Sequence, residues 1–73
     1  MKNKTNFLDA LLWILGGNKA SLTLSGITRV YYMNGSDIIC IPNNKPNIAY
    51  KMKEFKVDAI LSNNWILIED ETN

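Results

Sequence analysis

Histidine is absent from this chain of 73 residues, and Cys40 is its single cysteine. The lone cysteine excludes an intrachain disulfide, and a Cys/His metal site is not expected either. The longest apolar run near the N-terminus, residues 11–15, is far too short to span a membrane. One free thiol also fits a reducing compartment. We therefore expect a cytoplasmic protein that needs no cofactor and has no membrane partner.

The chain has no large excess of either charge, because its 8 Lys and Arg residues are nearly balanced by 7 Asp and Glu residues. A DNA mimic would be strongly acidic, and a duplex binder would need a large cationic excess. Nucleic acid is therefore not an expected partner. A single-stranded nucleic-acid binder that uses the tyrosines with Lys51, Lys53 and Lys56 is a weaker reading.

The length allows one domain, residues 1–73, with residues 1–5 and 70–73 expected to fray. A hydrophobic fraction of 47% is typical of a globular protein. A single core in so short a chain is marginally stable, and small folds compensate with disulfides, metals or self-association. Since the first two are not expected, self-association remains open.

The segment 6–17 has the pattern of a capped amphipathic helix. Asn6 is a suitable N-cap, and Gly16-Gly17 suits the helix end because glycine adopts the left-handed conformation freely. The apolar stripe falls at spacings of three and four, at Phe7, Leu8, Leu11, Leu12 and Leu15. Trp13 lies off this stripe, where it either seals the edge of the core or lies at a subunit interface.

From Lys19 onward the hydrophobic period changes to two, which is typical of half-buried antiparallel strands. Ser25-Gly26 either divides this run into two strands or bends one strand at a bulge. Asn34-Gly35 lies between residues 30–33 and 38–41 and favours the turn of a β-hairpin.

The second half of the chain continues with a loop at 42–47, a strand at 48–55, a helical turn at 57–62 and a strand at 65–69. The predicted fold class is α+β. An N-terminal helix packs on a mainly antiparallel sheet of about five strands, with a short helical turn before the last strand.

No arrangement of side chains in the sequence matches a known catalytic motif, so we expect a binding protein and not an enzyme. Cys40, among isoleucines, is interpreted as a small core residue. The candidate ligand-binding residues suit a planar, polar ligand: aromatic rings can stack on it, arginine can grip a phosphate, and amides can bind base or ribose edges. They are Arg29, Tyr31, Asn63, Asn64 and Trp65.

Two stretches carry a resemblance to a known family. Residues 6–19 resemble a Phe-x-x-Ala-Leu helix that closes on Gly-Lys before the first strand. Residues 57–69, with Asp58 and Trp65, resemble the Asp-Ile-Leu-Ala-x-Asp-Trp-x-x-x-Glu ending of the same family. These are the phage and prophage proteins of the second type of Thoeris anti-defence. The family often has an Arg and a Trp on the first strand, which residues 20–26 lack, and Asn64 replaces its Asp before the closing Trp.

The resemblance implies a homo-oligomeric protein in the host cytoplasm that catalyses nothing. It would bind and sequester a cyclic ADP-ribose-type or cyclic nucleotide immune signal without cleaving it, in pockets between subunits. An alternative from another class is a protein-binding inhibitor that uses the same scaffold to dock onto a host defence protein.

Overall fold

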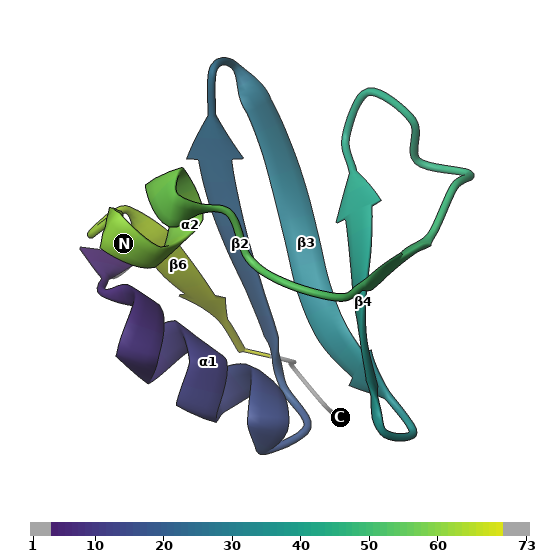
Figure 1. Ribbon diagram of the computed structural model, residues 1–73, viewed down its shortest axis with the longest axis horizontal. Helices are drawn as coiled ribbons and strands as arrows, with labels where there is room; N and C mark the ends of the chain where they lie inside the picture. The colour runs from purple at the N-terminus through teal and green to yellow at the C-terminus, as the bar shows by residue number, and fades with distance from the viewer. Residues whose placement is uncertain (1–3, 70–73) are drawn as a thin grey trace.

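The computed structural model describes residues 4–69, in which helices cover one face of a single six-stranded antiparallel sheet (Figure 1). The strand order is β1-β6-β2-β3-β4-β5, so the last strand of the chain inserts between the first two. The predicted α+β class is confirmed. The elements are β1 (Lys4–Thr5), α1 (Phe7–Leu15), β2 (Lys19–Leu24), β3 (Ile27–Asn34), β4 (Asp37–Pro42), β5 (Tyr50–Met52), α2 (Val57–Leu61) and β6 (Trp65–Ile68).

The predicted fraying of residues 1–5 is wrong for Lys4 and Thr5, which form β1. They pair with β6, where Thr5 lies opposite Trp65. This two-residue strand accounts for the sixth strand of the sheet, and it protects backbone groups of β6 that would otherwise form an open sheet edge. Because Lys4 and Thr5 are both polar, they show no hydrophobic alternation, and nothing in the local sequence predicts that they pair with β6. Residues 1–3 and 70–73 lie outside the described residues.

Helix α1 begins and ends where its caps predict. The Asn6 side-chain oxygen accepts a hydrogen bond from the backbone N–H of Asp9 at 2.8 Å, which satisfies one of the free donors of the first turn. Gly17 has a φ of +96°, a conformation in which an L side chain would be strained. The glycine therefore releases the chain from the helix into β2.

Two tight turns connect β2, β3 and β4. Leu24 pairs with Ile27, which leaves Ser25 and Gly26 as a two-residue turn, and both have positive φ, as in a type I′ turn. The hairpin between β3 and β4 is confirmed, but its central residues are Gly35 and Ser36, one position later than expected. Gly35 has a φ of +66° and Ser36 does not have a positive φ, so the turn is of type II′, which takes glycine first.

The core lies between the sheet and α1, and Trp65 is its largest buried side chain. Its indole N–H donates to the carbonyl of Ala59 at 2.8 Å, so β6 is bonded to α2 through a side chain. Trp13 donates to the carbonyl of Ile68 at 3.1 Å in a partly buried position. Trp13 therefore seals the edge of the core between α1 and β6.

The two helices cover only part of this inner face. Helix α1 packs against β2, β3 and β6. The predicted strand at 48–55 is shorter than expected, and after Met52 the chain crosses in front of the sheet to reach α2 (Figure 1). We call residues 53–56 the crossing segment. None of the helices in residues 4–69 has the length and apolar character needed to cross a membrane.

Candidate functional site

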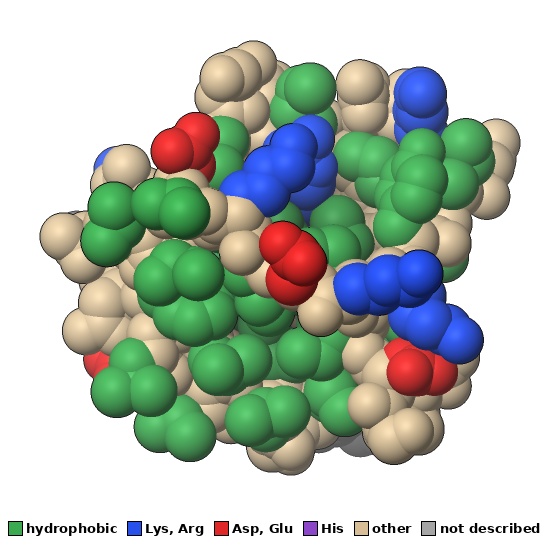
Figure 2. All heavy atoms as spheres, viewed as in Figure 1, with side chains coloured by type: hydrophobic (Ala, Val, Ile, Leu, Met, Phe, Trp, Pro, Cys, Tyr) green, Lys and Arg blue, Asp and Glu red, His purple; other side chains and the backbone are tan. Residues whose placement is uncertain are grey.

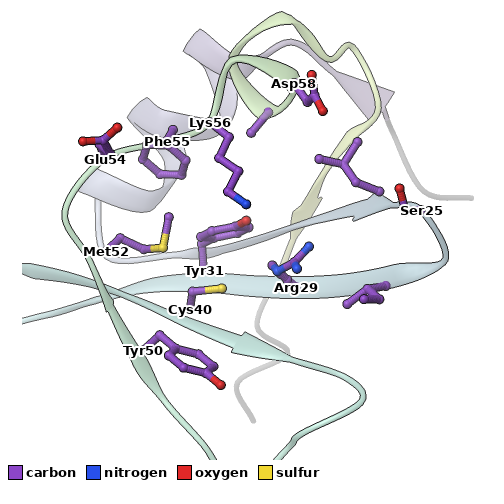
Figure 3. A pocket seen from close by; sticks show the side chains of 13 residues that line it. Ser25, Arg29, Tyr31, Cys40, Tyr50, Met52, Glu54, Phe55, Lys56 and Asp58 are labelled. Carbon is purple, nitrogen blue, oxygen red and sulfur yellow. The ribbon is translucent and has the colours of Figure 1, made fainter.

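A cleft of about 520 Å³ lies between the inner face of the sheet and the crossing segment (Figure 3). Its volume falls within the range of small-molecule sites. The floor comes from β3, β4 and β5, and the opposite wall from the crossing segment and α2. The lining residues are Leu24, Ser25, Ile27, Arg29, Tyr31, Cys40, Tyr50, Met52, Glu54, Phe55, Lys56, Asp58 and Ala59.

Arg29 occupies a position that a β-sheet usually fills with an apolar side chain. Its cross-strand partners are Leu22 on β2 and Pro42 on β4, and both are buried. Within residues 4–69 the one ion pair joins Lys51 Nζ to Asp37 Oδ2 at 3.6 Å, so no described carboxylate pairs with Arg29. A half-buried guanidinium without a carboxylate loses hydration and gains little in return. Its charge is therefore available to an anion in the cleft.

Lys56 brings a second cation to the same space from the opposite wall. Its side chain points from the crossing segment toward Tyr31 and the floor that carries Arg29 (Figure 3). The carboxylates of Glu54 and Asp58 lie farther out in the same view, away from the gap between the two cations. Neither acid forms an ion pair with Lys56 within the described residues. The cleft therefore has one cation on its floor and one on its opposite wall, with two carboxylates farther out.

Tyr31 lies at the back of the cleft and joins it to the core. Its ring centroid is 5.0 Å from that of Trp65 and 5.5 Å from that of Phe55. Burial, with a smaller contribution from the neighbouring Cys40, raises the pKa of Tyr31 to about 12, although Arg29 acts in the opposite direction. The phenol therefore remains protonated at neutral pH and can donate a hydrogen bond.

Cys40 pairs with Tyr31 across β3 and β4. Burial raises the pKa of the Cys40 thiol, while a hydrogen bond from Tyr31 and the charge of Arg29 offset part of the effect. Since the thiolate is the nucleophilic form, a raised pKa makes this thiol a poor nucleophile at neutral pH.

The remaining surface of the cleft is apolar and aromatic. Tyr50 and Met52 come from β5, and Phe55 comes from the crossing segment. Tyr50 is 44% exposed, so its ring is accessible from solvent. Aromatic faces of this kind can stack on a planar ring, so the cleft combines two cations with surfaces for a flat ligand.

The structure brings together two of the five residues that the sequence predicts as ligand-binding. Arg29 and Tyr31 line the cleft. Trp65 lies behind Tyr31 with none of its surface exposed, and it does not line the cleft. Asn63 and Asn64 are exposed at the corner after α2, outside the cleft lining, where the Asn64 backbone N–H donates to Ser62 Oγ at 3.0 Å. That corner therefore has a structural role in the turn between α2 and β6.

Tyr50, Phe55 and Lys56 also line the cleft but are not among the five candidate ligand-binding residues that the sequence predicts. Lys56 belongs to a local group with Lys51 and Lys53, for which solvation is the ordinary interpretation. Only Lys56 of the three lines the cleft. No signal in the local sequence distinguishes it from its neighbours, because its position depends on the path of the crossing segment.

Comparisons of the chain with protein-family models, curated proteins and solved structures found no match. The described residues contain no group of three or more Cys, Asp or Glu side chains arranged to hold a metal ion. The functional argument therefore rests on the cleft and its charges.

Proposed function

We propose that this protein binds and sequesters an anionic nucleotide signal of the cyclic ADP-ribose or cyclic nucleotide type, and that it does not cleave the signal. The observation that carries the proposal is Arg29, a half-buried cation on the inner sheet face without a carboxylate partner among residues 4–69. A phosphate group between Arg29 and Lys56 would receive charge-assisted hydrogen bonds from both sides of the cleft.

The other walls of the cleft support a ligand that is planar as well as anionic. Tyr50 and Phe55 offer aromatic surfaces, and Met52 adds a polarizable apolar one. Glu54 and Asp58 are acceptors at the outer part of the cleft, where they suit ribose hydroxyls or an exocyclic amine. A nucleotide presents all three kinds of group within one molecule.

Retention of the signal is favoured over its hydrolysis by the chemistry of the lining residues. The chain has no histidine, and the raised pKa of the Cys40 thiol disfavours its nucleophilic form. The resemblance of residues 6–19 and 57–69 to phage anti-defence proteins agrees with a role in which binding alone withdraws the signal from a host defence system. The host cytoplasm is the expected place of action.

Calorimetry against cyclic ADP-ribose isomers, cyclic dinucleotides and cyclic trinucleotides tests this proposal. We expect stoichiometric binding of at least one of these ligands, and recovery of the ligand intact after heat denaturation of the complex. Absence of heat with the whole panel would overturn the proposal, and recovery of a cleaved product would replace sequestration with catalysis.

A matched pair of lysine variants locates the binding site. Lys56→Gln removes a cation that lines the cleft, whereas Lys53→Gln removes one from the same segment that does not line it. We expect the first variant to weaken binding at least tenfold and the second to leave it unchanged, since one charge-assisted hydrogen bond contributes about 1.5–3 kcal/mol. Equal affinities in the two variants would place the site elsewhere.

A further inference from the structure

Strand β5 lies at one end of the sheet and is shorter than its sequence predicts. It comprises Tyr50–Met52, and the strand order leaves it with β4 as its one neighbour in the sheet. The alternating pattern of a strand extends over residues 48–53, where large apolar side chains alternate with small or charged ones. We call residues 48–53 the β5 edge. Its sequence therefore favours a longer strand than the fold contains.

Pro42 limits the pairing between β4 and β5. Cys40 lies opposite Tyr50, so continued pairing would bring Ile48 opposite Pro42. Proline has no backbone N–H to donate to such a partner. The backbone N–H of Ile48 instead donates to the carbonyl of Lys45 at 3.1 Å. The first part of the β5 edge therefore stays outside the sheet.

The backbone N–H and C=O of Lys51 point away from the sheet. The two-residue turn at Gly35-Ser36 makes Asn34 and Asp37 a hydrogen-bonded pair, and such pairs alternate with non-bonded ones along antiparallel strands. By this alternation the backbone of Ile39 bonds to β3. Lys51 lies opposite Ile39, so it forms a non-bonded pair with β4 and its own polar groups are directed outward. These are the groups that an added strand uses.

Two lysines give the β5 edge a positive charge. Lys51 Nζ lies 3.6 Å from Asp37 Oδ2, but the two side chains are 64% and 46% exposed, so the ion pair is weak. Lys53 forms no ion pair within residues 4–69. Lysines on a sheet edge ordinarily discourage pairing with other strands. They repel a second copy of the same edge, whereas they attract an acidic strand.

The β5 edge also presents apolar surface. Ile48 and Tyr50 are 43% and 44% exposed. They alternate with Lys51 in sequence, so in an extended chain they project to the opposite face from it. Figure 2 shows cationic and apolar side chains close together on the right of the molecule, where Figure 1 places β4 and the loop that follows it. One face of the edge is therefore cationic and the other apolar.

We infer that the β5 edge binds an extended segment of another protein, in which acidic and apolar residues alternate, as an added strand of the sheet. Backbone hydrogen bonds to Lys51 would hold the segment, and its alternating side chains would match the two faces of the edge. Neither Lys51 nor Lys53 lines the cleft, so the inference does not rest on the proposed ligand.

Fluorescence anisotropy with labelled synthetic peptides tests the inference. The probe is a peptide in which valine and glutamate alternate. One counterpart has lysine in place of glutamate, and another has methylated backbone nitrogens, which cannot donate. We expect the probe to bind with an affinity that falls as salt is added, and neither counterpart to bind. In hydrogen exchange followed by NMR, the backbone N–H of Lys51 should become protected when the probe is bound.

Three variants locate the site. Lys51→Glu should weaken binding of the probe about tenfold, because it replaces an attraction with a repulsion. Lys4→Glu is the matched control and should bind like the wild type, since Lys4 is exposed on β1 at the opposite edge of the sheet. Lys51→Pro should abolish binding by removing the outward N–H. It should keep the fold, because an edge strand tolerates proline where the N–H faces solvent, and far-UV circular dichroism checks this.

Failure of the probe to bind would overturn the inference, as would equal affinity for either counterpart. Equal effects of Lys51→Glu and Lys4→Glu would also overturn it, because the charge at the β5 edge would then have no special role. Protection of the Lys4 backbone N–H in place of that of Lys51 would show that the added strand lies at the wrong edge. If Lys51→Pro does not fold, Lys51→Glu and the exchange measurement still decide the question.

Discussion

Replacement of Arg29 by methionine should stabilise the protein and remove its ability to bind an anion. Methionine keeps the apolar stem that packs beside Leu22 and Pro42, the cross-strand partners of Arg29, and it removes the guanidinium. An arginine selected for ligand binding lowers the stability of the ligand-free protein, whereas an arginine that contributes to the fold raises it. The two possibilities predict opposite signs for the change in unfolding free energy.

The magnitude follows from the surroundings of Arg29. Burial of a polar group without a partner costs about 1–3 kcal/mol in mutational data, and Arg29 is half-buried, so the gain should be about 1 kcal/mol. For the ligand, loss of two charge-assisted hydrogen bonds should weaken binding about 100-fold or more.

Urea unfolding followed by tryptophan fluorescence measures the first effect, and calorimetry measures the second. Inorganic phosphate offers a third measurement that needs no knowledge of the ligand, because an anion that binds only the folded state raises the melting temperature. Phosphate should raise the melting temperature of the wild type and not that of Arg29→Met. Lys53→Met, which changes an exposed cation outside the cleft lining, is the control and should behave like the wild type.

A loss of more than about 1 kcal/mol in Arg29→Met would refute the reasoning, because it would show that the guanidinium stabilises the fold. An equal response of wild type and variant to phosphate would refute the anion site as well.

Two further predictions concern the aromatic cluster behind the cleft. Trp65→Phe leaves the carbonyl of Ala59 without its hydrogen-bond donor in the core, so the free energy of unfolding in urea should fall by about 2–4 kcal/mol. Trp13→Phe removes a longer hydrogen bond in a partly buried site and should cost about 1 kcal/mol. Similar losses in the two variants would contradict the different burial of the two rings. The pKa of Tyr31 is about 12 in the folded protein and about 10 in the unfolded chain, so unfolding releases the phenol proton between pH 10 and 12. The free energy of unfolding should therefore fall by on the order of 2 kcal/mol as pH rises through that range. Tyr31→Phe should lose the part of this dependence that comes from Tyr31, and Tyr50→Phe should keep it, whereas equal profiles in the wild type and in Tyr31→Phe would contradict the raised pKa of Tyr31.

The sequence by itself determined the local elements, because each depends on residues close to one another in the chain. Asn6 and Gly17 set the limits of α1 through capping and a positive φ. Period-two alternation and the Gly-containing turns at Ser25-Gly26 and Gly35 produced the two hairpins. The α+β class followed from the order of these elements.

Only the tertiary structure decided which side chains share a site. Arg29 and Lys56 line the same cleft because β6 inserts beside β2, which forces the chain to cross the sheet between β5 and α2. The same insertion carries Trp65 into the core, so this candidate ligand-binding residue does not line the cleft. Strand order depends on how the whole apolar surface is buried at once, and no short stretch of sequence encodes that choice.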